Sequence, residues 1–374
     1  MSIQIKRFIV LMAALALAVA GCGRKIAPPT SVMDSPEYHY RYGLKNLDSD
    51  QIDDAMKSFE RAIALDPKSS LGYIGKGFAH SRKGEFKPAL ENMSKAKGLD
   101  PGIEANIGMI RLLSMQRAKD WVSEAESEFK AAQKKDPNSA RLHYFMGVAY
   151  KVAIDFDKAA KMFRKVIDIK KEFTSEANAE WALIQKIQRA APGTEIGKKI
   201  ALVGKIDRAD IAALFDQEMN LEKLFTKRGV TTEASTATQT EKVIKMEAAT
   251  DIADHWLKPS IDMVLKLQVH GLGAGPNHTF HPEKLISKGE FALMLEDILI
   301  KVSGDEKLAT KFLGATTPFS DVRNDQSFFN AAMIATSRGF LEADKATGEF
   351  RPGDAVSGAD ALLSIREFKN QLKF

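Results

Sequence analysis

The residues best equipped for chemistry are few, and their spacing suits none of the common sites. His270, His278 and His281 lie close together in a stretch rich in glycine and proline, which raises the idea of a metal site. Structural zinc sites usually combine His with Cys at fixed spacing, and this stretch has neither a Cys nor helical spacing. The glycine run at 271–275 follows a helical pattern, unlike a dinucleotide-binding loop, which follows a strand. Since the sequence also has no phosphate-binding loop and no G-x-S-x-G motif, we expect no metal, no cofactor and no enzymatic activity.

The most informative single residue is Cys22, the only cysteine of the chain. It follows two basic residues, Lys6 and Arg7, and an unbroken apolar run of 13 residues, 8–20. A membrane-spanning helix needs about 20 residues, so this run is too short to span and instead suits the core of a secretory signal peptide. Without a second cysteine the chain cannot form an internal disulfide, and packing must supply its stability.

The end of this segment, Val19-Ala20-Gly21-Cys22, resembles the lipobox of bacterial lipoproteins. The resemblance implies cleavage before Cys22 and attachment of lipid to it, so that the lipid is the membrane anchor. Gly23, the next residue, is not the aspartate that resembles an inner-membrane retention signal. This favours the outer membrane and a periplasm-facing chain. The alternative is an ordinary secretory signal with a chance cysteine beyond it.

Composition fits a folded protein of two or three domains. The 374 residues are 44% hydrophobic and 28% charged, with a formal net charge of +5. Removal of residues 1–21 takes away two cations and no acid, which leaves a net charge of +3. The sequence has no clustered stripe of Lys and Arg, and we therefore expect no nucleic-acid partner.

A repeat dominates the N-terminal half of the chain. Three Asp-Pro pairs, at Pro67, Pro101 and Pro137, are spaced by 34 and 36 residues. Ahead of each lie small residues and a large apolar residue four positions after an alanine, as in Ala55 and Phe59. Small residues let two helices cross closely, the large side chain fills the same helix face, and proline ends the second helix. The pattern resembles the tetratricopeptide repeat, with a fourth unit that lacks the proline.

The resemblance implies four helical hairpins in a curved stack, whose groove binds an envelope protein or peptide. The stretch 175–190 fits the capping helix that such stacks need for solubility. Five side chains are candidates for the partner groove, with packing between helices as the alternative: Tyr40, Tyr73, His80, Tyr144 and Tyr150.

A different repeat occupies the C-terminal part. Asp251 recurs at an offset of 70 as Asp321, and an aromatic residue follows each. A partial copy at 205–215 keeps the helix start, but Ile200 and Leu202 stand where Phe and Pro should be. Four more residues recur at the same offset as the same or a similar type: Phe280, Pro282, Ser287 and Glu290 match Phe350, Pro352, Ser357 and Asp360. The pattern resembles the S-layer homology module, whose copies form a three-part prism with grooves between the parts.

Each copy begins its helix with a capping motif, of which Ser287 with Glu290 is the strongest. The residue after the cap is a cation in two copies, Arg208 and Lys288, and Gly358 in the third. The helix dipole disfavours a cation there by roughly 0.3–1 kcal/mol, and a bound anion would offset that cost. In the S-layer homology family the matching arginine belongs to the groove that holds anionic cell-wall glycan.

By this resemblance we expect Arg208 and Lys288 to contact peptidoglycan or a secondary cell-wall polymer. Trp256 is a candidate for stacking on a sugar ring. The alternatives are solvated side chains for the two cations and core packing for Trp256.

These features predict an all-α chain, a helical-hairpin solenoid followed by mainly helical modules. The expected order is a signal peptide at 1–21, a tether at 22–34, four repeat units plus a capping helix at 35–192, a degenerate module and linker at 193–249, and two modules at 250–315 and 316–374. The predicted function is that of a non-enzymatic envelope lipoprotein that binds the cell wall through these modules and a protein through its repeats. The alternative is a scaffold or assembly factor for an envelope complex, with structural C-terminal modules.

Overall fold

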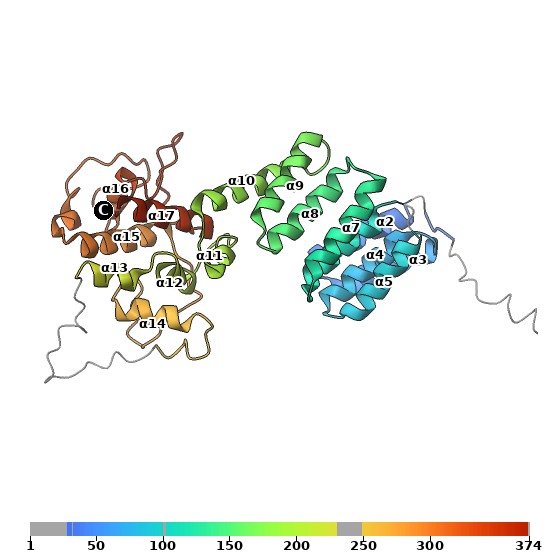
Figure 1. Ribbon diagram of the computed structural model, residues 1–374, viewed down its shortest axis with the longest axis horizontal. Helices are drawn as coiled ribbons and strands as arrows, with labels where there is room; N and C mark the ends of the chain where they lie inside the picture. The colour runs from blue at the N-terminus through green and yellow to red at the C-terminus, as the bar shows by residue number, and fades with distance from the viewer. Residues whose placement is uncertain (1–27, 32, 100–101, 230–248, 373–374) are drawn as a thin grey trace, which may run out of the picture. The chain divides into compact units, whose positions relative to one another are not determined.

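The computed structural model describes residues 28–31, 33–99, 102–229 and 249–372. The chain divides into two compact units, Met1–Trp181 and Ala182–Phe374 (Figure 1). The predicted signal peptide and Cys22 lie outside the described residues. The part that is described consists of helices and loops without a β-strand, which confirms the predicted all-α fold there. Within it, no helix has the length and apolar character to cross a membrane.

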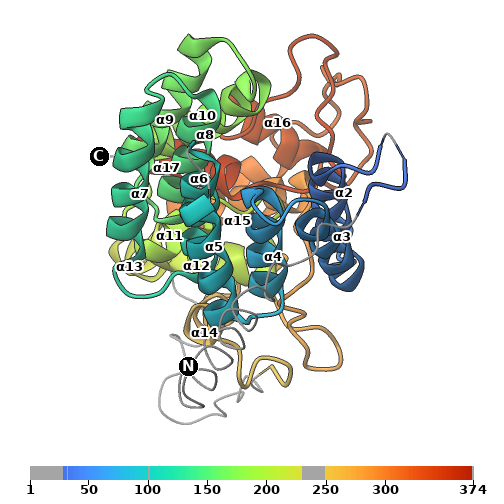
Figure 2. The ribbon, with the colours of Figure 1, turned by 90° about the vertical axis from the view of Figure 1, so that its right-hand side faces the viewer.

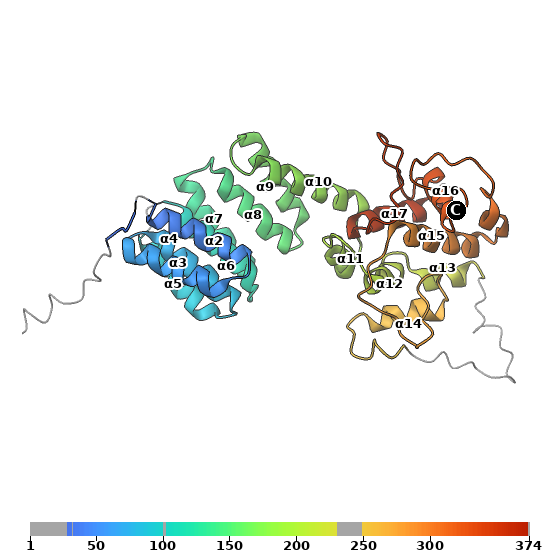
Figure 3. The same ribbon diagram turned by 180° about the vertical axis from the view of Figure 1, so that it is seen from behind.

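Unit 1 is a stack of helix hairpins. Figure 2 looks onto them, with α2 beside α3 and α4 beside α5, and Figure 3 shows them from the side opposite to Figure 1. Helices α2, α4, α6 and α8 also pack against one another in turn, and we call these four the inner helices. The bounds are α2 (Pro36–Asp48), α3 (Ile52–Leu65), α4 (Ser70–Arg82), α5 (Phe86–Leu99), α6 (Glu104–Gln116), α7 (Trp121–Lys135), α8 (Ala140–Val152) and α9 (Phe156–Ile169). The next helix, α10 (Thr174–Ala190), begins in unit 1 and ends in unit 2.

Phe59 shows why the repeat needs small residues. It is fully buried on α3, and its ring occupies the space where a side chain at Gly43 of α2 or Gly75 of α4 would lie. Phe163 of α9 has the same relation to Gly147 of α8, where a Cβ would lie 2.8 Å from the ring. Burying a phenylalanine contributes about 1.5–3 kcal/mol. The close helix crossing predicted from the repeat is therefore confirmed in its first and fourth hairpins.

Unit 2 contains three copies of one helix start, at α12, α15 and α17, joined by loops and shorter helices (Figure 1). Its helices are α11 (Glu195–Ile200), α12 (Arg208–Gln217), α13 (Leu221–Lys227), α14 (Lys258–Lys266), α15 (Lys288–Ser303), η1 (Glu306–Thr310), α16 (Phe329–Ser337) and α17 (Gly358–Gln371). We call the three segments around α12, α15 and α17 the first, second and third copies.

A closed ring of backbone hydrogen bonds joins the three copies. The N–H of Ile206 donates to the carbonyl of Val356 at 2.9 Å, and the N–H of Val356 donates to that of Ile286 at 3.0 Å. The N–H of Ile286 completes the ring by donating to the carbonyl of Ile206 at 3.0 Å. All three side chains are buried. Each copy is therefore bonded to both others, as the predicted three-part arrangement requires.

The helix caps repeat in all three copies. Ser287 accepts from the N–H of Glu290, whose carboxylate reaches back to the Ser287 N–H, and this confirms the predicted capping box. At Asp207 and Asp210 the sequence predicted a weaker version, but the structure has the same reciprocal bonds. Burial raises the pKa of Asp210 to about 6, because a desolvated carboxylate holds its proton more tightly.

Gly358 forms the tightest contact between copies. A methyl group at this position would overlap the carbonyl oxygen of Ile200, at the end of α11. The Gly358 N–H also donates to the carbonyl of Val203 at 2.9 Å. The third copy therefore lies directly on the backbone of the first, with no room for a side chain between them.

This contact predicts that Gly358→Ala is destabilising. The added methyl must push α17 away from α11, at a cost of about 1–3 kcal/mol, typical of overpacking. Gly353→Ala is the matched control, because Gly353 is exposed and a Cβ there has no neighbour within 4 Å. Urea unfolding of both variants checks the prediction, and equal midpoints would contradict it.

Candidate functional site

Three equivalent positions follow the helix caps. The residue in the first copy contacts the second copy, that in the second contacts the third, and that in the third contacts the first. Arg208 lies over the ring of Phe280, with its Cζ 4.5 Å from the ring centroid. Lys288 lies over Phe350 in the same way, with its Nζ at 4.6 Å. Gly358 contacts Ile200, which occupies the position that Phe280 and Phe350 hold in the other two copies. The cation and the aromatic ring thus come from different copies, and the third pair has lost both partners.

Arg208 is a buried connector between the first two copies. Only 8% of the residue is exposed. Its guanidinium donates to the carbonyls of Phe280 at 2.7 Å and Gly273 at 2.8 Å, and also to that of Gly271. Burial lowers the pKa of Arg208, because desolvation disfavours the charged form. The alternative of a solvated side chain is therefore wrong for Arg208, whose donors hold the loop that carries these three carbonyls.

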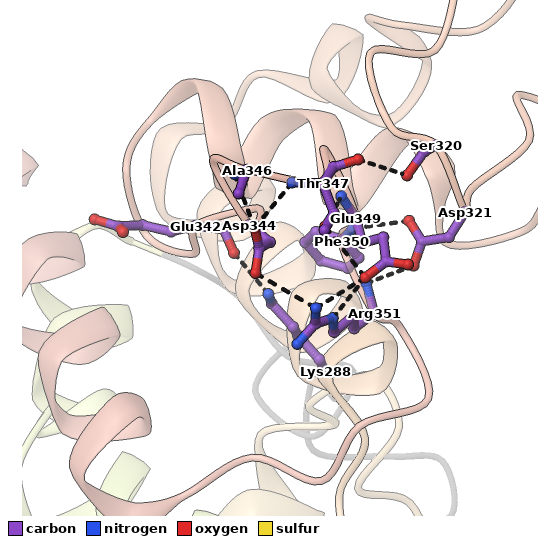
Figure 4. A network of polar contacts seen from close by, with 10 residues as sticks. All are labelled: Lys288, Ser320, Asp321, Glu342, Asp344, Ala346, Thr347, Glu349, Phe350 and Arg351. Carbon is purple, nitrogen blue, oxygen red and sulfur yellow. Dashed lines mark hydrogen bonds and ion pairs between the residues drawn. The ribbon is translucent and has the colours of Figure 1, made fainter. Parts of the chain in front are cut away.

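Lys288 is the more accessible of the two cations. Its Nζ donates to the carbonyl of Glu342 at 2.6 Å (Figure 4). Among the residues that the structure describes, no carboxylate lies within ion-pair distance of this ammonium group. Partial burial lowers the pKa of Lys288, against the smaller opposing effect of Asp360 and other acids nearby. Lys288 is thus half-buried and lacks a direct counter-charge.

A groove of about 670 Å³ opens beside Lys288, lined mainly by residues of the third copy and by Lys186 and Arg189 of α10. Its walls carry four cations and six carboxylates. Arg351 is held by Glu349 at 2.9 Å and Asp344 at 3.4 Å (Figure 4). Lys186 pairs with Asp360 at 2.7 Å. Two of the four cations, Arg351 and Lys186, are therefore paired within the groove, whereas Lys288 and Arg189 have no ion pair among the described residues.

One aspartate in each of the last two copies fixes the loop beneath the aromatic ring. Asp321 accepts from the N–H groups of Phe350 and Arg351, both at 2.7 Å (Figure 4). Asp251 accepts from the N–H groups of Phe280 and His281 at the same distances. The 70-residue offset predicted these aspartates as equivalent, and the structure supplies the reason. Two charge-assisted bonds hold each phenylalanine in position to receive the cation.

Trp256 is exposed, at 64% of its surface. It lies just before α14, in a turn, and the alternative of core packing is wrong for it. Its flat apolar face is therefore accessible to a partner.

The five predicted groove residues of unit 1 differ in exposure. Tyr40, Tyr73 and Tyr150 are buried, so packing between helices describes them better than an open groove. Tyr144 is partly exposed and stacks on Phe173, with ring centroids 4.7 Å apart. His80 is partly exposed and lies 2.6 Å from the carboxylate of Glu85.

The sequence reasoning missed two arginines. Arg351 follows the recurring Phe350, and comparison with His281 at the same repeat position could have drawn attention to it. Arg111 has no repeat signal, since it lies in the loosest repeat unit. Its surroundings come from two other hairpins, because its guanidinium lies between the rings of Phe78 and Phe145.

Comparison with known proteins supports both repeat systems. A tetratricopeptide repeat model matches residues 36–69, and an S-layer homology domain model matches residues 318–362. The chain therefore carries a tetratricopeptide repeat followed by an S-layer homology domain, and both are non-catalytic domain types.

The curated relatives resemble the chain over limited stretches. The anaphase-promoting complex subunit CDC16 of Saccharomyces cerevisiae is 28% identical over 123 residues, which is 33% of this chain and 14% of that protein. Cellulose synthase operon protein C of Escherichia coli is 28% identical over 115 residues, which is 30% of this chain and 10% of that protein. The chain thus matches only a small part of the length of either relative.

Because the two cations differ in burial and hydrogen bonding, replacing each by alanine should lower the free energy of unfolding by different amounts. Arg208→Ala leaves three carbonyls without their charged donor and should destabilise the chain by about 2–4 kcal/mol. Lys288→Ala, which loses one bond from a half-buried side chain, should cost less than about 1 kcal/mol. Urea unfolding measures both, and a larger loss for Lys288→Ala would contradict the assigned roles.

Proposed function

We propose that this chain is a non-enzymatic scaffold of the cell envelope. Its C-terminal copies bind peptidoglycan or a secondary cell-wall polymer in the groove beside Lys288, and its helical repeats bind a protein partner. The single observation that carries the proposal is the state of the three equivalent positions. Gly358 is packed on backbone, Arg208 is occupied by loop carbonyls, and Lys288 borders an open groove.

Lys288 has the features of a ligand-binding cation. Its charge is partly desolvated, it has no carboxylate partner among the described residues, and it lies at the N-terminus of α15. A helix N-terminus and an ammonium group that has no carboxylate partner among the described residues together favour an anionic or hydroxyl-rich ligand. The wall polymer is the ligand that best combines this chemistry with an S-layer homology domain.

One further surface fits the same proposal. The exposed indole of Trp256 offers a flat apolar face that can stack on a sugar ring. Arg208 acts indirectly here, since it fixes the loop at Gly271 and Gly273 and is not itself exposed to a glycan.

The proposed location is the outer membrane, with the chain facing the periplasm. Cleavage before Cys22 and lipidation of its thiol would anchor the chain, and residues 23–34 would tether the repeats.

The alternative, a scaffold that binds only proteins, is favoured by one observation. The groove beside Lys288 has six carboxylates against four cations, and an excess of acid repels an anionic polymer. In that case the C-terminal copies are structural or bind protein.

Co-sedimentation with purified sacculi tests the wall-binding proposal. We expect the unaltered chain to pellet with sacculi, and Lys288→Ala to weaken binding about tenfold, which is the effect of losing roughly 1.4 kcal/mol. Lys307→Ala is the matched control, because Lys307 is an exposed lysine of η1 outside the groove. Equal pelleting of the Lys288 and Lys307 variants would remove Lys288 from the mechanism. Failure of the unaltered chain to pellet would favour the protein-only scaffold.

The lipid anchor has its own test. Cells fed a labelled palmitate analogue should incorporate label into the unaltered chain, which should fractionate with the outer membrane. Cys22→Ser should remove both the label and the membrane association, because it removes the only thiol. Retained label in Cys22→Ser would contradict lipidation at this residue.

A further inference from the structure

The first helix of unit 1, α2, exposes two tyrosines and two cations on one face. Tyr38 and Tyr42 are 39% and 48% exposed, and their rings lie nearly parallel with centroids 6.1 Å apart. Arg41 and Lys45 are also exposed. Neighbours in this set are three or four positions apart, which places the side chains on the same side of a helix. We call these four residues the tyrosine face of α2.

The described part of the chain leaves the tyrosine face uncovered. Among the described helices α2 is the first of the stack, and it packs mainly against α3 and α4. Within the same residues, none of the four side chains makes a hydrogen bond or an ion pair. The packing of unit 1 therefore does not account for these side chains, and the face is available to a partner.

The residues just before α2 are held against unit 1 by one aspartate. The Asp34 carboxylate accepts from the N–H of Thr30 at 2.7 Å and lies 2.7 Å from Nε2 of His39. Arg61 of α3 donates to the same carboxylate from Nε at 3.1 Å, and it also donates to the Pro28 carbonyl at 3.1 Å. The Arg61 guanidinium holds the pKa of Asp34 well below its usual range, so the carboxylate stays charged. Pro28 is therefore fixed beside α2 and α3.

This fixed point shortens the tether of the proposed lipid anchor. Only residues 23–27 separate Cys22 from Pro28. An extended chain advances at most about 3.6 Å per residue, so the steps from Cys22 to Pro28 span no more than about 22 Å. With lipid on Cys22, the part of unit 1 that contains α2 is thus confined to the neighbourhood of the bilayer surface.

We infer that the tyrosine face of α2 lies against the lipid headgroups of the membrane that holds the anchor. The inference rests on the proposed function, because it requires lipid at Cys22. Tyrosine suits this boundary, since its ring is apolar and its hydroxyl stays hydrated. Arg41 and Lys45 can lay their stems along apolar surface and keep their charges at the headgroup phosphates. A short tether raises the effective concentration of the face at the surface, so a contact that is weak by itself suffices.

The aromatic rings, more than net charge, should hold this contact. The exposed cations of α2, Arg41 and Lys45, are balanced by its exposed acids, Glu37 and Asp48. Attraction of the helix to anionic lipid is therefore small, and burial of ring surface supplies most of the binding. The two tyrosines are the residues whose removal tests the contact.

Nitroxide quenching on the mature lipidated chain in vesicles tests the inference. The vesicles contain phosphatidylethanolamine and phosphatidylglycerol, with a fraction of lipid that carries a nitroxide near its headgroup. Because Cys22 is the only cysteine and lipidation consumes its thiol, an introduced cysteine is a unique labelling site. A fluorescent nitrobenzoxadiazole label is placed at Arg41→Cys on the tyrosine face and, as control, at Lys161→Cys, which is exposed on α9.

We expect the nitroxide lipid to lower the emission at position 41 at least about twofold, because interfacial side chains lie about 5–10 Å into the headgroup boundary. The label at position 161 should keep its emission. Adding Tyr38→Ser with Tyr42→Ser should remove the quenching at position 41, while the lipid keeps the chain on the vesicles.

The matched control for the tyrosine variant is Met115→Ser with Leu313→Ser. These apolar side chains are 42% and 63% exposed and lie outside α2, so their removal should leave the quenching at position 41 unchanged. Thermal unfolding checks that each variant is folded before quenching is compared.

The contrary results are distinguishable. Absence of quenching at position 41 in a vesicle-bound chain, or quenching that persists in a folded chain without both tyrosines, would overturn the inference and leave the lipid anchor intact. A blue-shifted but unquenched label, together with a dimer in sedimentation, would assign the face to a second copy of the chain. Mass spectrometry establishes the lipid on the mature chain, and its absence would overturn both the inference and the proposed anchor.

Discussion

The ring of three hydrogen bonds among Ile206, Ile286 and Val356 is the constraint on which unit 2 depends. A single copy has one long helix and a few loops, too little to bury a core by itself. The ring brings three such segments to one point and places each helix start against a neighbouring copy. Because the bonds are buried, any sliding of one copy would leave backbone groups without partners. The copies are therefore held in a fixed register.

This fixed register makes the differences between the copies informative. The position after the cap is Arg208, Lys288 or Gly358, and its surroundings change with it. Arginine is long and has several donors, so it binds a folded-over loop, whereas glycine permits direct backbone packing. Lys288 donates one hydrogen bond to the Glu342 carbonyl and borders a groove. The residue at this position thus decides whether backbone, loop carbonyls or a groove lies beside the start of each helix.

Unit 1 uses close packing differently, to repeat one hairpin. Phe59 and Phe163 fill the space that glycines on facing helices leave, and the hairpins stack through the inner helices. Several aromatic side chains of the repeat are buried in this packing, including Tyr40, Tyr73 and Tyr150. Arg111 is different, because its guanidinium lies between two aromatic rings that belong to other hairpins.

The sequence by itself determined whatever depends on local spacing. The proline period, the small residues of the hairpins, the capping motifs and the 70-residue offset can be recognised within one helix or by comparing similar segments, and the structure agrees with them. The equivalence of Asp251 and Asp321 was of this kind.

Only the tertiary structure decided the fate of individual side chains, because their partners lie far along the chain. Arg208 is bonded to a carbonyl 72 residues away, and no local pattern indicates that its donors are already used. Trp256 looks like a core residue by type, yet the loop that carries it leaves it exposed. Arg111 acquires its setting from rings on two other hairpins. Local periodicity fixes which face of a helix is buried, whereas the charge, room and partners at a site are set by elements that meet only after folding.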